Sequence, residues 1–179
     1  MPDANGDRNP LDVLASIVQG EPNVRLQFVG NRIALEVTTS AKSAPTTLEV
    51  GSFQRLFEIL VHEPATANEI EAAIAEIEDM LMPAIRALPK HGHLMTLASP
   101  FDALLQAVGR PDADTVQLEI STVEDVFGRL ASVAYGTPAT QLGVPESRSF
   151  AAAVLVLREL MHHAGFGSVL FEQRPTGAE

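Results

Sequence analysis

The sequence predicts an α+β fold, in which an antiparallel sheet carries helices packed mainly on one face. Apolar residues alternate with polar ones over residues 24–37, which indicates a β-hairpin. Other strand patterns occur at isolated places rather than in regular alternation with helices, which disfavours a doubly wound parallel sheet. We expect a single domain over residues 9–172 with flexible tails at 1–8 and 173–179, and a break near 109–114 as the two-subdomain alternative.

The first third of the chain is predicted to hold one helix followed by a β-meander. Apolar residues recur at helical spacing over residues 9–20. Residues 24–28 and 33–37 then alternate, and Gly30 between them can adopt the positive φ of a tight hairpin turn. Residues 47–50 predict a third strand, because they follow a polar loop and are rich in strand-forming side chains.

The middle of the chain is predicted to be helical. A helix is expected over residues 53–62, and Thr66 with Glu69 forms the capping-box pair that marks the start of a longer one. Pro83 either kinks or ends that second helix, because proline removes an i to i−4 hydrogen bond. Residues 84–98 give no clear pattern beyond an apolar run at their end.

The last third is predicted to alternate strands and helices. Ser121 and Glu124 form a second capping-box pair, and Gly165 is a C-terminal stop signal. The expected elements are a helix over 100–108, a strand over 116–120, a helix reaching 135, a helix over 147–163 and a strand over 166–172.

Charge and composition argue against several classes of binding partner and indicate a cellular location. The formal net charge of −11 repels phosphate backbones, so we expect no binding to nucleic acid or anionic membranes. The sequence contains no apolar run of about 18 residues and no basic, apolar leader. A cytoplasmic protein is therefore expected, and the abundance of Ala and Arg over Lys suggests a bacterial source.

Five histidines are the main candidates for chemistry, because the chain has no cysteine to offer a metal ion. His91 and His93 flank Gly92, and in an extended segment their side chains would point the same way and could bind one ion. His62 is a candidate third ligand. The alternative is a polar loop in which Gly92 serves a turn and the imidazoles face water.

A second candidate ligand pair lies near the end of the last predicted helix. Glu159 and His162 stand three residues apart and share a helix face. Carboxylate-bridged di-metal bundles use this spacing, but they need two such steps and this chain has one. The alternative is that His162 and His163 interact with the helix dipole. The cofactor is thus unknown from the sequence, with a divalent metal as the candidate.

Met80 and Met82 are candidates for an interface. They flank Leu81, and three adjacent large apolar side chains on a helix cannot all face one core. The sequence therefore predicts a homodimer.

No complete catalytic signature is present. The chain has no Gly-x-Ser-x-Gly elbow, no cysteine nucleophile and no glycine-rich phosphate loop that enters a helix. The sequence therefore favours a soluble, acidic, non-catalytic binding or assembly protein that recognises a protein partner or a small ligand. The alternative is a metal-dependent, hydrolase-like enzyme that uses His91 and His93 with one of His62, His162 or Glu159.

Overall fold

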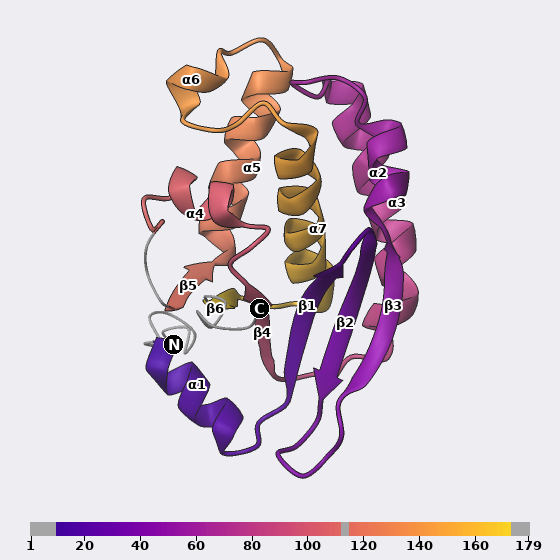
Figure 1. The fold of residues 1–179 in the computed structure, drawn as a ribbon, viewed down its shortest axis with the longest axis vertical. Helices are drawn as coiled ribbons and strands as arrows, with labels where there is room; N and C mark the ends of the chain where they lie inside the picture. The colour runs from indigo at the N-terminus through magenta and orange to yellow at the C-terminus, as the bar shows by residue number, and fades with distance from the viewer. Residues whose placement is uncertain (1–9, 112–114, 173–179) are drawn as a thin grey trace, which may run out of the picture.

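The chain forms one mixed β-sheet with its helices stacked against it (Figure 1). The computed structural model describes residues 10–111 and 115–172. The predicted tails and part of the predicted subdomain break lie outside these residues, so the predicted domain boundaries stay predictions.

Seven helices and six strands make up the described part of the chain. In chain order they are α1 Pro10–Val18, β1 Asn23–Val29, β2 Arg32–Thr38, β3 Thr46–Ser52, α2 Phe53–Ile59, α3 Ala67–Ile85, β4 His93–Leu97, α4 Asp102–Ala107, β5 Thr115–Glu119, α5 Ile120–Ala134, α6 Ala139–Leu142, α7 Arg148–Ala164 and β6 Ser168–Glu172.

The sheet has the strand order β3-β2-β1-β4-β6-β5. Strands β1, β4 and β6 run parallel, while β2, β3 and β5 pair antiparallel with their neighbours. The prediction of an antiparallel sheet is therefore wrong, although the mixture of strands and helices is confirmed. The error arose at β4, whose three central residues are all buried. A parallel strand covered on both faces has no polar alternation to reveal it.

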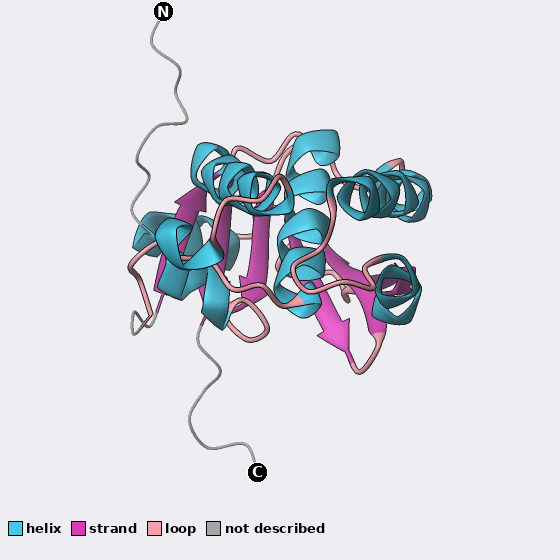
Figure 2. Cartoon of the chain, turned by 90° about the horizontal axis from the view of Figure 1, so that it is seen from above, coloured by secondary structure: helices cyan, strands magenta, loops and turns pink. Residues whose placement is uncertain are grey.

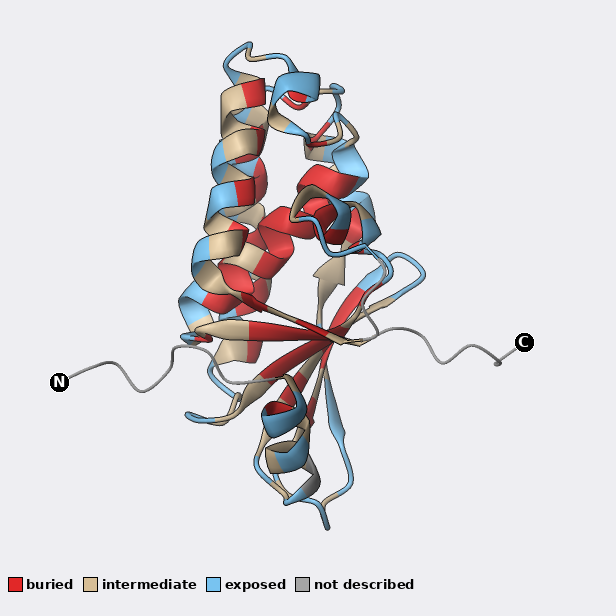
Figure 3. Cartoon of the chain, turned by 90° about the vertical axis from the view of Figure 1, so that its left-hand side faces the viewer, coloured by how far each residue is buried: buried red, intermediate tan, exposed pale blue. Residues whose placement is uncertain are grey.

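The helices cover the two faces of the sheet unequally (Figures 2 and 3). Helix α7 packs between α3 and α5 on one face and is buried along most of its length. On the other face α1 contributes a small separate cluster, in which Val13 contacts Met95 and Leu170. The expectation that helices pack mainly on one face is thus confirmed. Within the described residues, no helix is long and apolar enough to span a membrane.

Several predictions of local structure are confirmed. Gly30 has φ +60° in the β1–β2 turn, and Thr66 with Glu69 forms a complete capping box at the start of α3. Pro83 lies inside α3, which ends two residues later. The second predicted capping box is wrong: α5 begins at Ile120, so Ser121 is already helical and caps nothing.

Candidate functional site

A pocket of about 390 Å³ opens at the carboxyl ends of β1 and β4. Parallel sheets commonly bind ligands at this edge, because the connections that leave neighbouring strands diverge there. The wall is formed by five segments: the β1–β2 turn, the segment after β4, α2, α4 and the first turns of α7. The lining residues are Phe28, Gly30, Asn31, Phe53, Phe57, Ser99, Pro100, Ala103, Ser147, Ser149, Phe150 and Ala153.

One wall of this pocket is aromatic. The ring centroids of Phe28 and Phe53 lie 4.8 Å apart, and those of Phe53 and Phe57 lie 5.8 Å apart. The guanidinium of Arg148 sits 5.1 Å from the centre of the Phe57 ring. Such contacting rings offer a flat or apolar group a surface that excludes water.

Another part of the wall is the N-terminus of α7. Ser147 caps this helix, with its Oγ accepting a hydrogen bond of 3.3 Å from the Phe150 amide. The Arg148 amide donates to Glu63 Oε1 at 2.9 Å, and the Ala151 amide donates to the Ser147 carbonyl. Among the first-turn amides this leaves the Ser149 N–H without a partner in the described part of the chain. An unpaired amide at the positive end of a helix dipole favours an anionic group.

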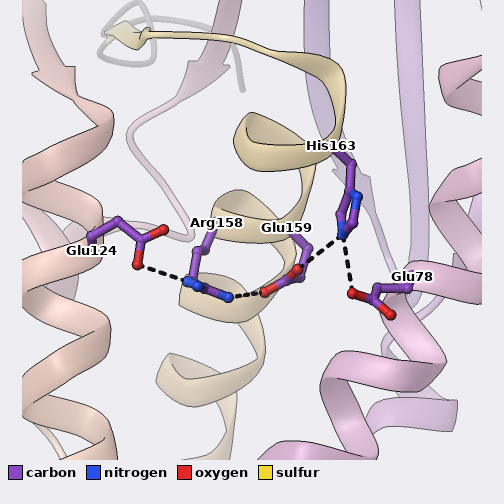
Figure 4. A network of polar contacts seen from close by, with 5 residues as sticks. All are labelled: Glu78, Glu124, Arg158, Glu159 and His163. Carbon is purple, nitrogen blue, oxygen red and sulfur yellow. Dashed lines mark hydrogen bonds and ion pairs between the residues drawn. The ribbon is translucent and has the colours of Figure 1, made fainter.

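A second polar site lies farther along α7 and links it to α3 and α5 (Figure 4). Arg158 Nε donates to Glu124 Oε2 at 3.0 Å, and Arg158 Nη1 donates to Oε1 of Glu159, whose side chain is only 2% exposed. His163 Nε2 lies 3.1 Å from Glu78 Oε1 and 3.4 Å from Glu159 Oε2. Burial alone would lower the pKa of Arg158, but the hydrogen bond and the charges of the two carboxylates raise it above its usual value.

Three residues of this network form a group that could hold a divalent metal ion. Ligand atoms from Glu78, Glu159 and His163 all lie within 4.8 Å of one another. Of the predicted ligands, only Glu159 belongs to this group. The predicted partner, His162, is exposed, and its ring packs edge-on against that of His163. The step of four residues, not three, aligns the imidazole with Glu159.

The predicted histidine pair lies elsewhere, at the amino ends of the parallel strands. His91 and His93 line a pocket of about 510 Å³ there. His93 Nε2 bonds Glu21 Oε2 at 2.7 Å, while His91 is exposed. Gly92 has φ +152°, and a Cβ at this position would lie 2.5 Å from the Pro22 carbonyl oxygen, so the turn requires glycine. Within the described residues, neither imidazole belongs to a group of three converging metal ligands.

The other predicted residues have local partners. His62 Nδ1 lies 2.7 Å from Glu69 Oε1, so this histidine is joined to the N-terminal cap of α3. Met80 is half-buried and its sulfur packs over Gly51 of β3, so packing within the chain accounts for it. Met82 is 39% exposed and stays an interface candidate.

The pocket beside α7 was missed at the sequence level. Its polar groups are a turn amide, serine hydroxyls and a helix end, none of which forms a recognisable motif. The turn residues Gly30-Asn31 and the helix cap Ser147 are visible in the sequence. They indicate a pocket only once β1 and β4 are known to be parallel neighbours.

No protein-family model matches the sequence, and no curated protein is similar enough in sequence to count as a match. Solved structures do share the fold. The Aquifex aeolicus PPX-GPPA enzyme matches with a TM-score of 0.67 and 12% identity, over 92% of this chain and 57% of that one. An exopolyphosphatase from Cytophaga hutchinsonii matches with a TM-score of 0.62 and 14% identity, over 91% and 57%. An exopolyphosphatase-like protein matches with a TM-score of 0.61 and 16% identity, over 86% and 55%.

These neighbours correct the functional prediction. The solved structures that share the fold are PPX-GPPA and exopolyphosphatase proteins, and this finding contradicts the expectation of a non-catalytic binding or assembly protein. The hydrolase-like alternative agrees with them better. This chain spans little more than half the length of each of these neighbours.

Proposed function

We propose that this chain binds a small organic phosphate ester in the pocket beside α7 and hydrolyses it. The observation that carries the proposal is the position of the pocket, at the carboxyl ends of β1 and β4, in a fold shared with phosphatases. The phosphoryl group would lie at the N-terminus of α7, where the Ser149 amide and the Ser147 hydroxyl can donate hydrogen bonds to it.

The lining favours a phosphate ester over a long phosphate chain. Phe28, Phe53 and Phe57 present apolar rings that would contact an organic group, and no lysine or arginine lines the described pocket. A polyphosphate would bring many charges to an apolar wall of a protein with a net charge of −11. An aromatic or apolar alcohol esterified to one phosphate could contact the phenylalanine rings with its organic group and the N-terminus of α7 with its phosphoryl group.

In the proposed reaction, water attacks phosphorus and the bond between phosphorus and the ester oxygen breaks. The alcohol leaves with one proton, and inorganic phosphate remains. Glu63 does not line the pocket, but its Oε1 accepts a hydrogen bond from the amide of Arg148, the residue next to the lining Ser149. We assign Glu63 the role of accepting the proton from water. The helix end holds the phosphoryl oxygens while charge shifts to the leaving oxygen.

The test is phosphate release from p-nitrophenyl phosphate and from polyphosphate, each measured with a divalent metal and with EDTA. Ala103→Phe places a ring in the pocket and should lower kcat/KM at least tenfold. Ala72→Phe is the matched control, because Ala72 is exposed on α3 away from the pocket. Absence of phosphate release from the monoester under every condition would overturn the hydrolase proposal, and faster release from polyphosphate would overturn the substrate class.

A further inference from the structure

Three side chains that could together hold a metal ion converge between α3 and α7, well away from the pocket proposed for the phosphate ester. Glu159 lies ten residues along α7 from Ser149, which is about 15 Å along the helix axis. We propose that Glu78, Glu159 and His163 bind one zinc-type divalent ion that joins the two helices. This inference does not depend on the proposed hydrolysis.

Two of the three distances between ligand atoms suit a tetrahedral ion, and the two carboxylate oxygens lie within 4.8 Å of each other. With metal–ligand bonds of about 2.0–2.1 Å, two ligand atoms of a tetrahedral site lie about 3.3 Å apart. His163 Nε2 lies 3.1 Å from Glu78 Oε1 and 3.4 Å from Glu159 Oε2. The ion would therefore replace the imidazole proton at Nε2 with little movement of the side chains.

The donor types favour zinc over magnesium or calcium. One imidazole nitrogen and two carboxylate oxygens form a three-ligand set, and zinc accepts such a set with a fourth position left for water. Magnesium and calcium prefer oxygen donors only, and in larger number. The side chains of His163 and Glu78 are 29% and 43% exposed, so water can reach the fourth position.

The neighbouring charged side chains orient Glu159 and leave the proposed site with a negative charge. Arg158 bonds Glu159 Oε1, which leaves Oε2 directed at His163. Arg158 is also a nearby cation, but Glu124 shares its charge through a 3.0 Å ion pair. With His163 neutral, the three carboxylates Glu78, Glu124 and Glu159 and the guanidinium sum to −2, and a divalent ion neutralises this charge.

The experiment is a competition titration of untagged full-length protein against a chromophoric zinc chelator, paired with thermal unfolding in Zn²⁺, Mg²⁺ or EDTA. We expect one equivalent of Zn²⁺ to bind and to raise Tm, with no effect of Mg²⁺. His163→Gln and Glu78→Gln should each weaken zinc binding at least tenfold, since each removes one of three ligands.

His162→Gln is the matched control, because it removes the adjacent imidazole that lies outside the group. Since Glu78, His162 and His163 are at the surface, circular dichroism spectra of all three variants should match the wild type. Equal zinc affinity in the wild type and His163→Gln, or no zinc binding by the folded wild type, would overturn the proposal. Neither readout uses phosphate release, so failure here leaves the proposed hydrolysis untouched.

Discussion

The two ends of α7 offer opposite chemistry. At its N-terminus the helix presents an amide and serine hydroxyls to an aromatic pocket whose described lining has no charged residue, although Arg148 stacks on the lining Phe57 and Glu63 accepts from the Arg148 amide. Toward its C-terminus it carries Arg158, Glu159 and His163 in a network with carboxylates of α3 and α5. The first end suits an anion attached to an apolar group, and the second suits a cation. The two ends of α7 therefore suit ligands of opposite charge.

The largest expected effect comes from the charged end. Arg158→Met leaves the buried Glu159 carboxylate without its cation, and we expect a loss of about 3 kcal/mol in the free energy of unfolding. Urea denaturation measures this loss. The double variant Arg158→Met with Glu159→Met should recover most of it, because the buried charge is removed together with its partner. Glu124 also loses its ion pair with Arg158, but its side chain is partly exposed and can be hydrated. If the double variant is as unstable as the single one, packing of Arg158 on Phe127, not charge, is its main contribution.

A smaller effect is expected at the N-terminal cap of α3. Partial burial alone would raise the pKa of Glu69, but hydrogen bonds from the Thr66 amide, His62 and the Val61 amide lower it to about 2. Because the folded pKa lies below the ordinary 4.5, this stabilisation is present above pH 4.5 and is lost as the pH falls toward 2.

Glu69→Gln should therefore lower stability at pH 7 by about 1.5 kcal/mol and flatten the acid limb of the stability curve. Urea midpoints measured from pH 2 to 7 test this expectation. Glu71→Gln is the control, since Glu71 is exposed on the same helix. An unchanged acid limb in Glu69→Gln would contradict the assignment.

The cap of α7 has a smaller effect on stability. Ser147→Ala removes the acceptor for the Phe150 amide and should cost about 1 kcal/mol of unfolding free energy. Ser149→Ala should change stability by less than about 0.5 kcal/mol, because its side chain caps nothing. Ser147→Ala should weaken the binding of phenyl phosphate, measured by calorimetry, because it removes the hydroxyl proposed to donate to the phosphoryl group. Ser149→Ala keeps the proposed donor, its backbone amide, and is the matched control. Wild-type affinity in Ser147→Ala would remove the helix end from the proposed binding site.

Local signals predicted local structure well, and the topology and the site less well. The Gly30 turn and the Thr66–Glu69 box depend on neighbours in sequence, so they could be predicted from the sequence. The parallel pairing of β1 with β4 joins residues about 70 apart and decides where a pocket opens. Glu159 was predicted as a ligand, but Glu78 lies on another helix and could not be identified as its partner from sequence spacing.

The smallest effect on the fold is expected at Met82, one helical turn beyond Glu78 on the charged end of α3. Met82→Glu should change stability by less than about 0.5 kcal/mol, since the side chain is 39% exposed. If the predicted homodimer uses this surface, the same substitution should reduce the mass measured by light scattering to that of a monomer, because two buried carboxylates would face each other. Ala72→Glu, exposed on the same helix, is the control. A wild-type mass equal to 19.1 kDa would contradict the dimer itself, and an unchanged dimer mass in Met82→Glu would place the interface elsewhere.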